Sequence, residues 1–160
     1  MPQHQAVVGL ALQDNKILLG KRLTSSTNLG VNLYAGIGGK IEDGETSEQA
    51  LIREFAEEVG AKPIEFSKVG QVGFVFLHKA PESKWNMIVD VFRITKLNGM
   101  PRKSEAIEPM WFNIENIPYN YMWPDNFYWI HLVIKNIQFV GEFVYKDADS
   151  LEQIYVKILE

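Results

Sequence analysis

The sequence has no cysteine among its 160 residues, which excludes disulfide-stabilised scaffolds, cysteine-ligated zinc sites, iron–sulfur clusters and thiol nucleophiles. It also lacks a surplus of positive charge, because 16 Lys and Arg stand against 20 Asp and Glu, for a formal net charge of -4. Binding to a polymeric nucleic acid depends on clustered basic residues that neutralise phosphates. We therefore expect no nucleic-acid polymer as a partner.

Long hydrophobic runs are absent as well. The apolar stretch over residues 6–12 is too short to cross a bilayer or to form the core of a signal peptide, so we expect no membrane partner and a cytoplasmic location. No repeat or low-complexity linker divides the chain, and 46% of its residues are apolar. These properties indicate one globular domain over residues 1–160, and they leave open whether the protein is a monomer or a dimer.

The distribution of apolar residues predicts a fold with both strands and helices. Residues 6–12 and 16–19 flank the turn signal Gln13-Asp14-Asn15, as in a hairpin. Residues 30–44 hold five of the 12 glycines and are expected to form a loop. Further strands are predicted over residues 69–77, 87–94, 110–112, 139–145 and 153–159, and a helix over residues 125–135. The mixture indicates an α/β domain built on a mixed sheet.

A second helix is predicted over residues 47–59, directly after the glycine-rich segment. Thr46 and Gln49 have the spacing of a capping box, and Gly60 is a typical residue for the end of a helix. Leu51 and Phe55 recur at helical spacing and are expected to face the core.

Glu54, Glu57 and Glu58 lie on one side of this helix, because residues three and four positions apart share a helix face. Like charges at this spacing destabilise a helix by about 0.2–0.5 kcal/mol per pair. The cluster is therefore expected either to face open water or to hold a cation. Taken by themselves, the three residues favour the first interpretation, a solvated acidic face.

The spacing around this helix resembles the signature of the Nudix hydrolases over residues 39–61. The matching positions are Gly39, Glu45, Arg53, Glu54, Glu57, Glu58 and Gly60. The resemblance implies an α/β/α sandwich around a mixed β-sheet. It further implies hydrolysis of a nucleoside diphosphate linked to another group, with Mg²⁺ as the cofactor and Mn²⁺ as the alternative cation. The residues that match the metal ligands of the family are the main-chain carbonyl of Gly38 and the side chains of Glu54, Glu57 and Glu58.

The same resemblance implies the catalytic residues Arg53, Glu54, Glu57, Glu58 and Glu105. Arg53 matches an arginine that orients a catalytic glutamate through charge-assisted hydrogen bonds. Glu105 is included because a further metal-binding glutamate of the family aligns with its neighbour Ala106. Glu45 is expected to brace the loop rather than to bind metal. The sequence does not decide which glutamate is the general base.

An aromatic segment in the C-terminal half indicates a base pocket. Trp123 supplies an indole that can stack on a nucleobase, and an ionised Asp125 can accept hydrogen bonds from a guanine-like edge. The alternative is a proline-initiated helix with Asp125 or Asn126 near its N-cap. Over most of its length the chain resembles the MutT-type hydrolases of oxidised purine nucleoside triphosphates. The substrate contacts that this resemblance implies are Arg22, Ile37, Gly38, Gly39, Lys40, Phe74, Trp123, Pro124, Asp125 and Asn126.

Two departures from the animal members of that group concern the base. Asn126 stands where they have a second aspartate, and Ala35 stands where they have an asparagine that touches the base. An amide offers both a donor and an acceptor. We therefore expect the Asn126 amide to turn either way and the base preference to differ.

The expected activity is Mg²⁺-dependent hydrolysis of an oxidised purine nucleoside triphosphate, such as 8-oxo-dGTP, to the monophosphate and pyrophosphate. This reaction would sanitise the nucleotide pool. One alternative is a Nudix hydrolase of another nucleotide, such as an unmodified nucleoside triphosphate or a nucleotide sugar. The other is a nucleotide-binding module without catalysis, which the intact Arg53-Glu54 and Glu57-Glu58 pairs disfavour.

Overall fold

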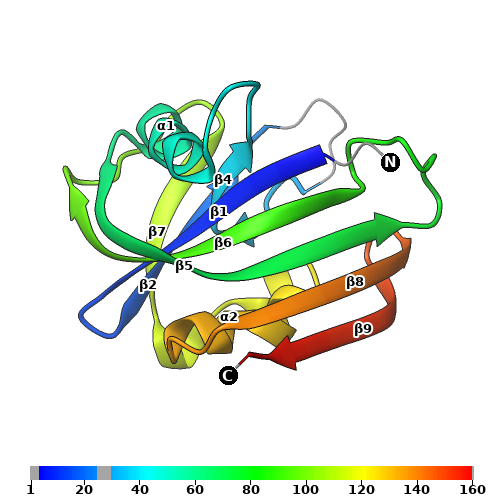
Figure 1. Ribbon diagram of the computed structural model, residues 1–160. Coiled ribbons are helices and arrows are strands. Elements are labelled where there is room, and N and C mark those ends of the chain that lie inside the picture. The colour runs from blue at the N-terminus through cyan, green and yellow to red at the C-terminus, as the bar shows by residue number, and fades with distance from the viewer. Residues whose placement is uncertain (1–3, 25–29, 160) are drawn as a thin grey trace.

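A nine-stranded sheet organises the computed structural model, which describes residues 4–24 and 30–159 (Figure 1). Its strands are β1 (His4–Gln13), β2 (Lys16–Arg22), β3 (Tyr34–Ala35), β4 (Ile37–Lys40), β5 (Lys62–Phe76), β6 (Met87–Asn98), β7 (Ile107–Asn113), β8 (Phe139–Asp147) and β9 (Ser150–Ile158). The α-helices in these ranges are α1 (Ser47–Val59) and α2 (Asn126–Ile134). Neither is long and apolar enough to cross a membrane.

The sheet is mixed, as the sequence predicts. Its main order is β3-β2-β1-β6-β5-β8-β9, with β4 paired to β1 and β7 paired to β2. Strand β1 runs parallel to β6, and β5 runs parallel to β8, whereas the other pairs are antiparallel. Parallel neighbours need a crossover connection, and helix α1 lies in the connection that leads from β1 toward β6.

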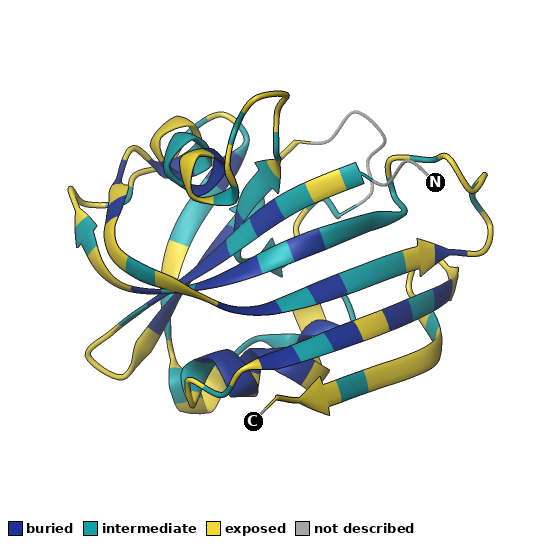
Figure 2. Ribbon diagram, viewed as in Figure 1, coloured by how far each residue is buried: buried dark blue, intermediate teal, exposed yellow. Residues whose placement is uncertain are grey.

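Alternation along β1 and β2 separates two hydrophobic cores on opposite faces of the sheet. Leu10, Ile17 and Leu19 pack in the core that includes the buried face of α2. Ala11 and Leu18, their neighbours in sequence, pack in the core that includes the buried face of α1. Figure 2 shows buried and less buried segments alternating along the strands. The two helices therefore cover opposite faces, which gives the α/β/α sandwich (Figure 1).

The glycine-rich segment over residues 30–44 is not only a loop, because it contains the short strands β3 and β4. The prediction was wrong at these positions. Strand β4 pairs with β1 so that Gly38 lies opposite Val8, and a Cβ at Gly38 would overlap the carbonyl of Val7. Glycine thus permits the close pairing, but it lacks the side chains whose alternation identifies a strand in a sequence.

Helix α1 begins and ends where the sequence predicts. The backbone N–H of Gln49 donates to Thr46 Oγ1 at 3.1 Å, and the backbone N–H of Thr46 donates to Gln49 Oε1 at 2.9 Å. Gly60 ends the helix in the left-handed region, at φ 67°. Leu51 and Phe55 are fully buried against the sheet. Local hydrogen bonds therefore fix the helix ends, and packing fixes its face.

Thr46→Ala is expected to lower the free energy of unfolding by about 1 kcal/mol, because an N-cap side chain contributes roughly 0.5–2 kcal/mol. In a chain of this length the melting temperature should fall by about 2–4 °C. Calorimetry of this variant beside Thr24→Ala, an exposed threonine outside the helices and strands, measures the difference. Equal melting temperatures for Thr46→Ala and the wild type would show that packing alone fixes the start of α1.

Candidate active site

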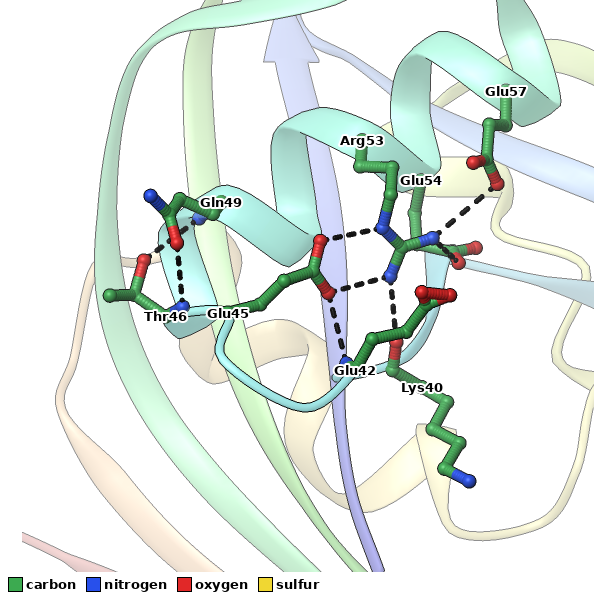
Figure 3. Close-up of polar contacts among 8 residues, drawn as sticks. All are labelled: Lys40, Glu42, Glu45, Thr46, Gln49, Arg53, Glu54 and Glu57. Atoms are coloured by element: carbon green, nitrogen blue, oxygen red, sulfur yellow. Dashed lines mark hydrogen bonds and ion pairs between the residues drawn. The ribbon is translucent and has the colours of Figure 1, made fainter.

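Arg53 on α1 binds three acidic side chains and one main-chain carbonyl (Figure 3). Its Nε and Nη2 donate to the two carboxylate oxygens of Glu45, at 2.6 and 2.9 Å. Its Nη1 donates to Glu54 at 2.7 Å and to Glu57 at 3.4 Å. Nη2 also donates to the Lys40 carbonyl, at 2.9 Å. The guanidinium therefore joins the loop that precedes α1 to the carboxylates of the helix.

Glu45 braces this loop, as expected. Its carboxylate also accepts a hydrogen bond from the backbone N–H of Glu42, at 2.9 Å. The hydrogen bonds from Arg53, followed by that from Glu42, lower the pKa of Glu45 to about 2. The contacts with Glu45 and Glu54 in turn raise the pKa of Arg53 above its ordinary value. The ion pair is thus fully charged throughout the pH range in which proteins fold.

The acidic cluster is only partly exposed to solvent. The Glu57 side chain is 60% exposed, but that of Glu54 is 13% exposed, and Glu58 is partly buried. Burial, followed by the negative charge of Glu54, raises the pKa of Glu58 to about 7, although Arg22 and the backbone of Gly38 oppose this rise. The interpretation as a solvated face is therefore wrong for Glu54 and Glu58, because α1 packs against β4 at this point.

The oxygen atoms beside β4 fit a hard divalent cation in their chemistry. The Lys40 carbonyl accepts from Arg53, so it lies on the edge of β4 away from β1, and Gly38, two residues earlier, projects its main chain to the same edge. A Cβ at Gly39 would overlap the Glu54 carboxylate, so the missing side chain makes room for it. In the described part of the chain, no three His, Asp or Glu side chains converge into a preformed ligand group.

A cavity of about 410 Å³ adjoins the acidic cluster. Arg22 and Gly39 line it, and both lie next to the cluster: Arg22 acts on the pKa of Glu58, and Gly39 touches Glu54. The same cavity is lined by four other residues predicted to contact the substrate, which are Phe74, Trp123, Asp125 and Asn126. The fold therefore brings predicted substrate contacts from distant parts of the chain around one space.

Asp125 is held by internal hydrogen bonds. It is 3% exposed, and its carboxylate accepts from Trp129 Nε1, at 2.8 Å, and from the Tyr145 hydroxyl. Burial raises the pKa of Asp125 to about 6, and these two donors oppose the rise. Asp125 precedes α2 at the N-cap position, but its side chain makes no capping hydrogen bond. The capping alternative is therefore wrong for this carboxylate.

The Asn126 amide has one fixed orientation. Its Nδ2 donates to the Trp123 carbonyl at 2.9 Å. Because a carbonyl can only accept, the amide nitrogen must lie on that side, and Oδ1 is the atom available to a ligand. The expectation that this amide turns either way is therefore wrong, since the preceding turn determines its direction.

Nine of the predicted site residues do not line the cavity. Five of them lie in the adjoining acidic site, on β4 and α1: Gly38, Arg53, Glu54, Glu57 and Glu58. The other four are Ile37, Lys40, Pro124 and Glu105. Ile37 is 1% exposed and packs in the core under α1, so its side chain is removed from the cavity. Lys40 is exposed, and its main chain is bound by Arg53. Glu105 is exposed in a bend just before β7.

Sequence reasoning missed Trp85 and Tyr145, which also line the cavity. Trp85 lies in the connection between β5 and β6, which carries no motif, and its ring centroid is 6.1 Å from that of Trp123. Tyr145 ends the strand predicted over residues 139–145, and the sequence predicts no role for it in the site. The signal that was available is its hydroxyl, because a buried tyrosine hydroxyl needs a hydrogen-bond partner.

Comparisons with known proteins agree with this arrangement. The family model described as NUDIX domain matches residues 2–133. The oxidized purine nucleoside triphosphate hydrolase of Mus musculus is 35% identical over 142 residues, which cover 89% of this chain and 86% of that protein. The protein of the same name from Danio rerio is 34% identical over 142 residues, with the same coverage of 89% and 86%. The crystal structure of the mutator MutT protein from Bacillus halodurans shares the fold, with a TM-score of 0.79 at 18% identity over 96% of this chain and 97% of that one.

Glu58→Gln is expected to flatten the pH dependence of stability in the metal-free protein. The pKa of Glu58 is about 7 in the folded state, against about 4.3 in an unfolded chain. Between these values the folded state binds more protons, so the free energy of unfolding falls as pH rises toward 7. Asp125 contributes a smaller fall of the same sign.

Thermal melts in EDTA at pH 5 and pH 8 measure this effect. The drop in melting temperature from pH 5 to pH 8 should be about 5–10 °C smaller in Glu58→Gln than in the wild type, the change that about 2.5 kcal/mol produces. Glu48→Gln, an exposed glutamate on the same helix, is the control and should keep the wild-type drop. An unchanged drop in Glu58→Gln would contradict the raised pKa.

Proposed function

The chain belongs to the Nudix hydrolase family, and we propose that it hydrolyses oxidised purine nucleoside triphosphates, such as 8-oxo-dGTP, to the monophosphate and pyrophosphate. This proposal rests on one observation: Arg22 and Gly39, next to the acidic cluster, line the same cavity as Trp123 and Asp125. A purine nucleoside triphosphate matches this lining, because it has an apolar ring at one end and a chain of anionic oxygens at the other. The reaction sanitises the nucleotide pool.

We propose that the cation of this reaction is Mg²⁺, with Mn²⁺ as the alternative, bound by Glu54, Glu57, Glu58 and the Gly38 carbonyl. When bound, it neutralises phosphate oxygens and lowers the pKa of the attacking water. Arg53 holds Glu54 in place through its 2.7 Å hydrogen bond. The candidate general bases are Glu54, Glu57, Glu58 and Glu105.

The substrate contacts follow from the cavity lining. Arg22 and Gly39 face the phosphates, Trp123 stacks on the base, and Phe74 forms part of the apolar wall. Asp125 and Asn126 meet the polar edge of the base. Gly38, Lys40 and Pro124 remain proposed contacts through their main chain or at the cavity rim. Ile37 is proposed only as a support of β4, because its side chain is buried in the core.

The whole chain is proposed to act as one catalytic domain, because the sheet runs continuously from β1 to β9. Its substrate is a small nucleotide rather than a nucleic-acid polymer or a membrane, in keeping with a net charge of -4. We place the reaction in the cytoplasm, where the nucleotide pool is found.

The decisive experiment is a steady-state comparison of 8-oxo-dGTP, 2-hydroxy-dATP, dGTP and dATP with Mg²⁺, with products identified by chromatography. The proposal requires that an oxidised purine nucleotide has the highest kcat/KM and that pyrophosphate is released. Preference for an unmodified nucleoside triphosphate or a nucleotide sugar would assign the chain to another branch of the family. Tight binding without turnover would make it a binding module.

Glu58→Gln is expected to lower kcat at least about 100-fold, because it removes a charged oxygen donor from the proposed cation site. The melting temperature of the metal-free variant should not fall, since the substitution relieves repulsion within the cluster. Glu48→Gln on the same helix serves as the matched control and should retain wild-type kcat. Near-native turnover of Glu58→Gln at saturating Mg²⁺ would show that the cation site uses other carboxylates.

Trp123→Ala is expected to raise KM for purine triphosphates about tenfold or more, because a base stacked on an aromatic ring contributes about 1–3 kcal/mol. Inorganic triphosphate has no base, so its turnover should change little. Tyr121→Ala removes a neighbouring aromatic ring that is 62% exposed and should leave both substrates unaffected. Equal losses for both substrates in Trp123→Ala would mean that Trp123 supports the fold and does not contact the base.

A further inference from the structure

Tyr145 is a fully buried tyrosine on β8 whose ring belongs to the aromatic wall of the cavity. The ring stacks on Phe76 with centroids 4.8 Å apart and planes 9° apart. Its plane lies edge-on to Trp123, at a centroid distance of 5.9 Å. Packing on two sides therefore fixes the ring, and with it the position of the hydroxyl at the start of α2.

The hydroxyl makes two hydrogen bonds to one residue. It accepts from the backbone N–H of Asp125, at 3.1 Å, and it donates to Asp125 Oδ1. An N–H can only donate, so the single hydroxyl proton must point to the carboxylate. Trp129 Nε1 donates to the other oxygen, Oδ2, at 2.8 Å. The main chain and both carboxylate oxygens of Asp125 are thus fixed by groups from β8 and α2.

We propose that Tyr145 is a positioning residue for base recognition, which holds Asp125 as a hydrogen-bond acceptor facing the purine. The inference rests on the proposed function and deepens it. An ionised carboxylate has about four acceptor positions, and the two internal donors use two of them. The remaining positions are available to N–H groups of a ligand in the cavity that Asp125 lines.

Asn126 adds a second acceptor beside the first. Its Nδ2 is bound to the Trp123 carbonyl, so its Oδ1 is directed away from that contact. Two fixed acceptors match a purine edge that presents adjacent N–H donors, as guanine and 8-oxoguanine do. Adenine presents a ring nitrogen that is itself an acceptor, so it fits this pair less well. Tyr145 thereby favours guanine-type bases over adenine-type bases.

The charges around Asp125 support this role. Burial raises the pKa of Asp125. The hydrogen bonds from Trp129 and Tyr145 and from the residue's own backbone lower it, and of these groups only Tyr145 has an ionisable side chain. The basic residues that line the cavity are Arg22 and Lys84. Loss of the hydroxyl should therefore raise the pKa of Asp125 further. A protonated carboxyl would present its own donor and would no longer match the N–H groups of guanine.

Tyr145→Phe tests the proposal, because it keeps the packed ring and removes only the hydroxyl. Tyr119→Phe, at a partly buried tyrosine that does not line the cavity, is the matched control. Calorimetric titration with 8-oxo-dGMP, dGMP and dAMP in EDTA measures base recognition without metal or catalysis. Steady-state kinetics with the four purine triphosphates from pH 6 to pH 8 measure it during turnover.

For Tyr145→Phe we expect the Kd of 8-oxo-dGMP and dGMP to rise about tenfold, since a hydrogen bond to a charged group is worth that factor or more, while the Kd of dAMP changes little. KM should rise with kcat nearly unchanged, and the loss should be larger at pH 6 than at pH 8. Tyr119→Phe should behave as the wild type. Equal losses for all three monophosphates, or an unchanged pH profile, would make Tyr145 merely structural and overturn the proposal.

The outcomes separate this inference from the proposed function. A wild type that hydrolyses oxidised purine triphosphates, together with an unchanged base preference in Tyr145→Phe, would refute the inference alone. A wild type that turns over none of the four triphosphates and binds none of the monophosphates would refute both.

Discussion

The permanent charge of Arg53 is the constraint on which the rest of the site depends. A guanidinium cannot lose its proton in a protein, so one that is partly buried must find acceptors. Arg53 finds them at Glu45 in the loop before α1, at the Lys40 carbonyl at the end of β4, and at Glu54 and Glu57 on its own helix. The position of β4 relative to α1 follows from these contacts. The acidic cluster therefore sits at a defined place beside the strand, although its like charges repel.

Strand β1 provides the second constraint, because both of its edges are paired and its side chains enter the cores on both faces of the sheet. One edge of β1 pairs with β4 over residues 6–9 and with β2 over residues 11–13, and the other edge pairs with β6. Val7 lies opposite Gly39 and lines the cavity together with its neighbours Ala6 and Val8. The cavity thus lies along the strand that pairs with β4. Residues as distant in sequence as Val7 and Tyr145 meet there because the mixed sheet sets β5 and β8 close by.

What the sequence predicts correctly is what local interactions decide. The side chains of Thr46 and Gln49 each bond to the other residue's backbone N–H, so the start of α1 can be read from a stretch of four residues. The strand at residues 37–40 could not be read in this way, because glycine has no side chain to show a pattern. The partners of Asp125 were equally hidden, since Tyr145 is 20 positions away and lies in another strand. Burial and long-range hydrogen bonds depend on the assembled sheet, which spacing in the sequence does not reveal.

Glu58 and Asp125 pose the same physical conflict at two places in the site. Burial disfavours the charge of each carboxylate and raises its pKa, to about 7 and about 6, whereas the proposed function uses the charged forms. Each carboxylate has neighbours that offset part of this cost, Arg22 for Glu58, and Trp129 and Tyr145 for Asp125. These neighbours offset the cost of burial only in part. Glu58 therefore keeps oxygen atoms available to a cation, and Asp125 keeps oxygen atoms available to N–H donors. Ligands that bind only the folded state then stabilise it with the logarithm of their concentration relative to Kd, so the stability given up in the empty protein is regained when the site is filled.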